Sequence, residues 1–172
     1  MSRRRFLMAS SGGGGGDSSN LLARSGWVTL EFPYYNGDIE KVTLNRSMDS
    51  SKALLEMTMS VSHNPSVGVD MFYALDIDLT DYSTLTISYS ALTNNSGSFD
   101  VSIANNAPTT WKDNPVNYGT QLVEGTSTTK IETDYVADIS NYSGTKTILL
   151  RLRGLAFANF TETFEITKLE VA

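Results

Sequence analysis

The chain has 172 residues, of which 40% are hydrophobic and 19% are charged, and it contains no cysteine. This length is enough for one domain with a sizeable core, and the missing cysteines exclude disulfides and thiolate metal sites. The net charge is −6 although the chain starts with three arginines, so the rest of the chain is acidic. An acidic body with few basic clusters is a poor binder of nucleic acid. No apolar run approaches the roughly 18 residues of a membrane-spanning helix.

The chain begins with a basic and hydrophobic peptide that runs into five consecutive glycines, Gly12 to Gly16. A twin-arginine export signal needs an apolar segment of about 7–15 residues, which these glycines cannot form. We predict an anchor peptide over residues 1–8, a flexible Gly/Ser-rich tether over 9–23 and one domain over 24–172. An alternative is a disordered tail without a role. The predicted anchor residues are Arg3, Arg4, Arg5, Phe6 and Leu7.

Alternation of apolar and polar residues predicts strands in the first part of the domain. A strand over 27–32 and a returning strand over 39–44 flank Asn36-Gly37, which is the strongest short signal of a hairpin turn. A further strand is predicted over 53–61 and another over 67–73.

The stretch from Leu75 to Tyr89 carries the clearest pattern. Leu75, Ile77 and Leu79 alternate with polar residues and predict a strand with one buried side; a polar corner and a second strand follow. The corner at 78–83 returns at 138–143 as a near copy, and again leads into an apolar strand.

Later strands are predicted over 99–103, over 130–139 with Ile131 and Tyr135 on one side, and over 148–152 with Arg151 and Arg153 pointing outward. A last strand over 164–171 closes the domain. Many short strands with turns between them and no long helix predict an all-β fold, an antiparallel β-sandwich or a barrel, behind a flexible glycine-rich arm.

Nothing in the sequence points to an enzyme. His63 is the single histidine and lies beside a predicted turn, so a catalytic triad would depend on that one base. Three acids in the central stretch suggest a carboxylate pair for glycoside hydrolysis, or a structural calcium site, although alternation on a solvent-facing side explains them more simply. These acids are Asp76, Asp78 and Asp81. We predict no cofactor.

The longest irregular stretch of the domain, residues 104–120, offers an aromatic platform with polar neighbours, as glycan binding requires. The alternative is that these aromatics cap the core or lie in a subunit interface. The predicted glycan-binding residues are Trp111, Lys112, Asn114 and Tyr118, with a weaker second platform at Tyr34, Tyr35 and Asn36.

The repeated corner, together with the ending Leu-Arg-Leu-Arg and Ile-Thr-Lys-Leu-Glu-Val, resembles one group of proteins. The resemblance is to jelly-roll β-sandwiches of the galactose-binding-like and carbohydrate-binding-module class, over residues 27–172. The arginine-rich opening followed by polyglycine resembles the anchor peptides of gut bacteriophage virion proteins. The resemblance implies a binding or assembly role and names no ligand.

We therefore expect a structural virion protein of the head-fibre or capsid-decoration type, attached to a capsid or tail protein through its N-terminal peptide. The expected state is a homo-oligomer such as a trimer, made in the host cytoplasm and located in the virion, with no membrane contact. The alternative is a carbohydrate-binding module, secreted and monomeric, that recognises a polysaccharide through the loop carrying Trp111.

Overall fold

The protein is a two-layer β-sandwich in a computed structural model that describes residues 19–34, 42–59, 67–93, 97–110, 118–156 and 160–172. Within these residues ten antiparallel strands form two five-stranded sheets, which confirms the predicted fold class. The elements are η1 (Leu21–Ala23), β1 (Val28–Tyr34), β2 (Val42–Met48), β3 (Ala53–Met59), β4 (Val67–Asp78), β5 (Thr84–Leu92), β6 (Ser98–Ala104), β7 (Thr120–Thr126), β8 (Thr129–Asp138), β9 (Thr145–Ala156) and β10 (Phe160–Val171).

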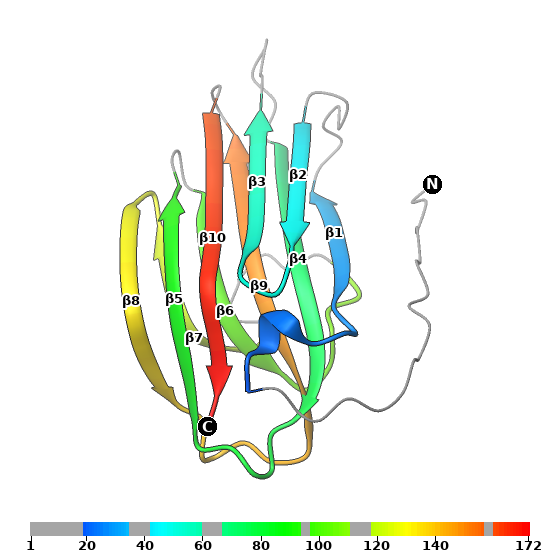
Figure 1. The fold of residues 1–172 in the computed structure, drawn as a ribbon. Coiled ribbons are helices and arrows are strands. Elements are labelled where there is room, and N and C mark those ends of the chain that lie inside the picture. Colours follow the sequence, from blue (N-terminus) through cyan, green and yellow to red (C-terminus); the bar gives the residue numbers. More distant parts are fainter. Residues whose placement is uncertain (1–18, 35–41, 60–66, 94–96, 111–117, 157–159) are drawn as a thin grey trace.

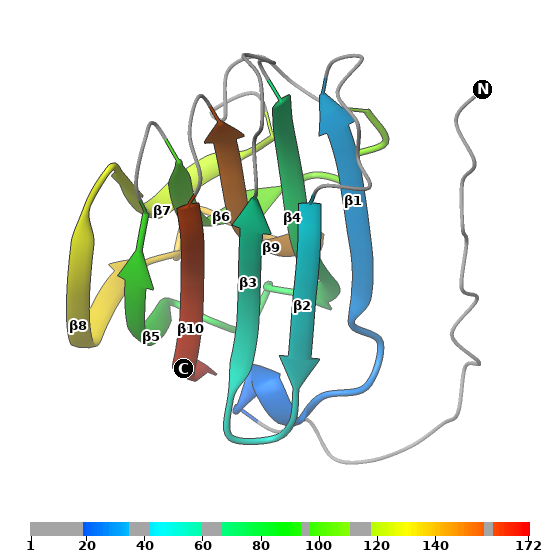
Figure 2. The same cartoon turned by 90° about the horizontal axis from the view of Figure 1, so that it is seen from above.

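The two sheets face each other across one main core (Figures 1 and 2). One sheet has the order β1-β4-β9-β6-β7 and the other has the order β2-β3-β10-β5-β8. The predicted alternation in the central stretch is confirmed, because Leu75, Ile77 and Leu79 are buried while Asp76 and Asp78 are exposed. Alternation with one buried side is what a sandwich strand requires, since successive side chains point to opposite faces.

The predicted hairpin between the first two strands is wrong. Strand β1 pairs with β4, whereas β2 pairs with β3 in the opposite sheet. The two strands meet only across the open side of the sandwich, where Arg46 of β2 forms an ion pair with Glu31 of β1. The turn at Asn36-Gly37 lies outside the described residues. Alternation shows which side of a strand is apolar, but it does not show which strand will be the neighbour.

Two further strands differ from the sequence prediction. Residues predicted as separate strands over 67–73 and from Leu75 onward form the single strand β4. Strand β8 lies at the edge of its sheet, and its register shifts beside Asp134, whose φ of 53° is positive. Ile131, Tyr135 and Val136 are therefore exposed, with Ile131 at 77%. A bulge that turns side chains outward is a common feature of edge strands.

The outer face of the sheet with β9 is also buried, which corrects the expectation for two arginines. Arg151 and Arg153 do point away from the main core, but they are 0% and 4% exposed. Tyr118, just before β7, packs on this face against Phe72, and Ala107, just after β6, packs against the same small cluster. Because a covered outer face has no solvent, it selects paired polar groups and apolar residues on both sides of a strand.

The body begins earlier than residue 24. Leu21 and Leu22 of η1 are buried in the main core, and the indole of Trp27 donates a hydrogen bond of 2.9 Å to the carbonyl of Leu21. The carbonyl of Ser19 accepts from the amide of Val171, and Asn20 forms an isolated bridge with Glu170. Residues 19–23, predicted as the end of the tether, therefore belong to the folded domain. In the described part of the chain no helix has the length and hydropathy to cross a membrane.

Candidate functional site

The two copies of the sequence repeat form two similar corners at one end of the sandwich. In the first corner Asp78 Oδ1 accepts from the amide and hydroxyl of Thr80, at 3.0 and 2.6 Å. In the second corner Asp138 accepts from Ser140 in the same way, at 2.9 and 2.7 Å. These hydrogen bonds, from the hydroxyl and then from the amide, hold the pKa of both carboxyl groups below its usual value. Each aspartate thus fixes the turn in which it lies.

The two corners are also bonded to each other. The amide of Leu79 donates to the carbonyl of Gly144 at 3.1 Å, and the amide of Ile139 donates to the carbonyl of Ser83 at 2.9 Å. The amide of Gly144 in turn donates to the hydroxyl of Thr80 at 2.9 Å. Gly144 has a φ of 67°, a conformation that glycine adopts at little cost. The corners therefore form one hydrogen-bonded end of the domain.

The second corner borders a hollow of about 610 Å³. Three carboxamides line it, from Asn105 and Asn106 after β6 and from Asn141 in the corner, and all three residues are exposed. Half-buried Tyr142 and Lys146 complete the polar side of the hollow, and the Lys146 ammonium donates to Asn105 Oδ1 at 2.8 Å. Hydroxyls come from Thr120 and Ser143.

The tyrosines of the two corners have different neighbours. Tyr82 and Tyr142 hold the same place in the two copies of the repeat, and both pack against the main core. The guanidinium of Arg24 donates to the hydroxyl of Tyr82 at 3.1 Å. Tyr142 lines the hollow.

The loop predicted to bind glycans contributes to this hollow through its ends. Trp111, Lys112 and Asn114 lie outside the described residues. Tyr118 is 5% exposed, which differs from the exposed ring expected for it. Its hydroxyl donates to Asp70 Oδ2 at 2.6 Å, and its ring lies edge-on to Phe72. Tyr118 is therefore a core residue at the base of the loop, and the glycan-binding role of the loop stays a prediction.

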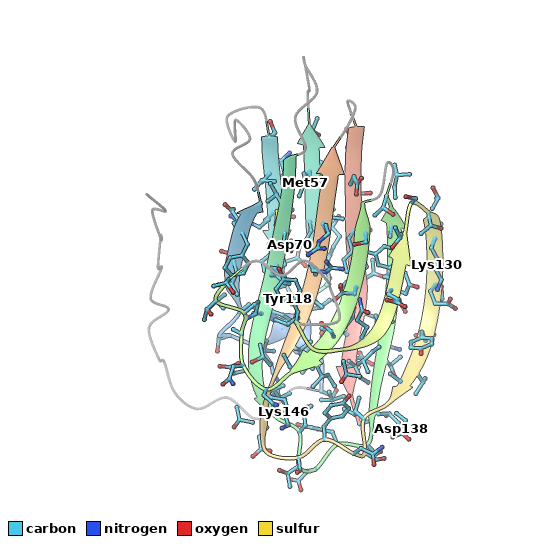
Figure 3. The ribbon with its side chains drawn as sticks, turned by 180° about the vertical axis from the view of Figure 1, so that it is seen from behind. Met57, Asp70, Tyr118, Lys130, Asp138 and Lys146 are labelled. Carbon is cyan, nitrogen blue, oxygen red and sulfur yellow. The ribbon has the colours of Figure 1, made fainter. Side chains whose placement is uncertain are left out.

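Asp70, beside Tyr118 in Figure 3, is the centre of a buried network of charges. Arg153 donates to both of its carboxylate oxygens at 2.7 Å, and Arg151 donates to it at 3.3 Å. Arg151 also pairs with Asp100 and donates to the hydroxyl of Ser98. Burial opposes the charge of Arg153, but the hydrogen bonds and the charge attraction of Asp70, together with Tyr118, outweigh burial and raise the pKa of Arg153. The charges of the two arginines and the two aspartates offset one another, so the network suits a structural role at the base of the loop.

The calcium site proposed from the sequence does not form. Asp76 accepts from the hydroxyl of Thr147 at 2.6 Å, while Asp78 is used within its own corner. Within the described ranges, no group of three or more acidic, histidine or cysteine residues is placed to hold a metal ion. Asp76 and Asp78 lie on the same side of β4, as their alternation predicts. Each accepts from a different partner, Thr147 for Asp76 and Thr80 for Asp78. His63 and the anchor residues, Arg3, Arg4, Arg5, Phe6 and Leu7, lie outside the described residues.

Known proteins resemble this chain only at the level of the fold. No protein-family model and no curated protein matches the chain. Among solved structures, it is similar to the carbohydrate-binding module TmCBM61 in complex with β-1,4-galactotriose, with a TM-score of 0.45, 10% identity and coverage of 88% of this chain and 90% of that one.

It is likewise similar to the family 11 carbohydrate-binding module from Clostridium thermocellum in complex with a mixed-linked tetrasaccharide, with a TM-score of 0.43, 14% identity and coverage of 88% and 91%. A cleaved adhesin domain of Lys-gingipain from Porphyromonas gingivalis gives 0.39, 14% identity and coverage of 84% and 98%. The likeness is one of fold.

Proposed function

We propose that the chain is a non-catalytic module that binds a glycan in the hollow beside the second corner. The observation that carries this proposal is the chemistry of the lining, in which Asn105, Asn106 and Asn141 converge with Tyr142. Carboxamides donate and accept hydrogen bonds at once, as neighbouring sugar hydroxyls require. The partly exposed ring of Tyr142 adds an apolar surface with a polar tip, against which the C–H face of a sugar packs.

The size and lining of the hollow agree with binding rather than with hydrolysis. About 610 Å³ lies within the range of roughly 300–1,000 Å³ that is usual for small-ligand sites. Hydrolysis of a glycosidic bond ordinarily needs two carboxyl groups across the bond, and among the described residues that line the hollow there is no carboxylate and no histidine. The hollow offers hydrogen-bonding groups and no general acid.

Loss of the exposed carboxamides should remove glycan binding and leave the fold unchanged. We expect the double variant Asn106→Ala, Asn141→Ala to lower affinity at least about tenfold, because two polar contacts to a ligand are lost. The measurement is a screen of soluble oligosaccharides by calorimetry, with thermal melting of each variant. The matched control is Asn45→Ala, an exposed asparagine on β2. Equal binding by the double variant and the parent would contradict the proposal, as would a parent that binds no glycan.

A second candidate function is the virion component, attached through residues 1–8 and assembled as a homo-oligomer. The observation that favours self-association is strand β8, where Ile131 and Val136 are 77% and 56% exposed at the edge of a sheet. Exposed apolar side chains beside unpaired strand edges suit contact with another chain.

This second function predicts that the full chain is a closed oligomer and that Ile131→Ser together with Val136→Ser converts it to a monomer. Light scattering on a sizing column measures the mass of both proteins. The control is Thr133→Ser, which changes an exposed residue of the same strand and keeps its polarity. A full chain that is already monomeric would exclude this form of assembly.

A further inference from the structure

Lys146 differs from the other lysines that the structure describes in having no acidic partner. Lys52, Lys130 and Lys168 each form an ion pair, with Glu165, Glu132 and Asp134 at 3.2, 3.9 and 3.0 Å. Lys146 donates to the neutral carboxamide of Asn105 instead, and in the described part of the chain no carboxylate pairs with it. In a protein of net charge −6, a lysine without a carboxylate is a notable exception.

The position of Lys146 is also unusual for a charged residue. It lies opposite Ile77 in the pairing of β9 with β4, on the side of β9 that carries Ile148 and Leu150. Ile77, Ile148 and Leu150 are all buried, so this side of the strand faces the main core. Lys146 is half-buried at its end, where Asn105 meets the hydrogen-bonding need of the ammonium but leaves its charge uncompensated.

We propose that Lys146 selects an acidic glycan, one whose sugars carry a carboxylate or a sulfate group. The proposal rests on the glycan-binding function argued above and names its ligand class. The ammonium would form an ion pair with the acidic group, and the carboxamides of Asn106 and Asn141 would bind neighbouring hydroxyls. Among the described residues that line the hollow there is no carboxylate, so no lining side chain repels an anionic sugar.

The test compares ligands that differ only in charge. Calorimetry with oligogalacturonate, with the same oligomer after full methyl esterification, and with a sulfated galactan oligosaccharide separates carboxylate from sulfate and both from a neutral sugar. We expect the parent protein to bind at least one acidic ligand about tenfold or more tightly than the neutral one, with affinity that falls as salt rises.

Variants then assign this preference to one residue. Lys146→Gln should reduce binding of the acidic ligand about tenfold or more, to the level at which the parent protein binds the neutral one. The control Lys168→Gln removes the same charge from β10, where Lys168 pairs with Asp134, and should bind as the parent does.

The two proposals fail in different ways. If acidic and neutral ligands bind equally and Lys146→Gln changes neither, the choice of an acidic glycan is overturned and glycan binding stands. If none of the ligands binds, both are overturned. If Lys168→Gln loses as much affinity as Lys146→Gln, the effect is one of net charge and the role of Lys146 is overturned.

Discussion

Replacement of Asp70 by alanine is expected to destabilise the domain by about 3–5 kcal/mol, because it leaves buried cations without their counter-ion. Asp70 is 0% exposed and accepts from Arg153 through both oxygens, from Arg151 and from the hydroxyl of Tyr118. Its removal would take away both carboxylate contacts of Arg153 and the acceptor of the Tyr118 hydroxyl.

Urea unfolding and thermal melting measure this effect, and for a domain of this size the expected loss corresponds to a fall in melting temperature of about 10 °C. The matched control is Asp81→Ala, since Asp81 is an exposed aspartate of the first corner and should cost little. A melting temperature for Asp70→Ala within about 2 °C of the parent would show that the network does not hold the covered face together.

Removal of the buried leucines of η1 is expected to have the second-largest effect. Leu21 is 0% exposed in the main core, so Leu21→Ala should cost about 3 kcal/mol for the lost apolar contact and the cavity left behind. Deletion of residues 2–18 should cost nearly nothing, because the sequence over 9–18 predicts a flexible Gly/Ser-rich tether. The same unfolding experiments compare the two proteins.

A further deletion tests where the body begins. Loss of residues 2–22 should be at least as damaging as Leu21→Ala, because it removes both leucines, the carbonyl that Trp27 binds and the bridge from Asn20 to Glu170. If this shorter protein has the same melting temperature as the parent, η1 does not stabilise the domain, and the boundary expected at residue 24 is the correct one.

Local patterns in the sequence predicted the sandwich but not the neighbours of its strands. The alternation around Leu75 and the repeated corners depend on contacts within a few residues, and both are confirmed. The pairing of β1 with β4 depends on residues about forty positions apart. Asn36-Gly37 favours a turn, yet a turn serves equally well between two strands of one sheet and between two sheets.

Burial of Arg151 and Arg153 was missed for a related reason. Their spacing places both arginines on the outer side of β9, and the outer side of a sandwich sheet is normally exposed to solvent. Tyr118 covers part of this face, and no periodicity in the sequence indicates that a residue just before β7 packs there. The partners Asp70 and Asp100 lie on two other strands, so their acidic character alone did not indicate a network.

The candidate site was predicted in part. The irregular stretch after Ile103 was expected to bind, and its two ends do line the hollow, at Asn105 and at Thr120. Asn141 and Tyr142 were visible as members of the repeated corner, but their packing beside that stretch depends on the fold.

The position of the last two strands has a consequence for biosynthesis. Strand β9 lies between β4 and β6 in one sheet, and β10 lies between β3 and β5 in the other. Each sheet therefore receives its central strand from residues 145–172, and before these residues leave the ribosome only the separate pairs β1-β4, β6-β7, β2-β3 and β5-β8 can form. Completion of both sheets must wait for β9 and β10, and the strand edges that are exposed during that delay favour association with other chains.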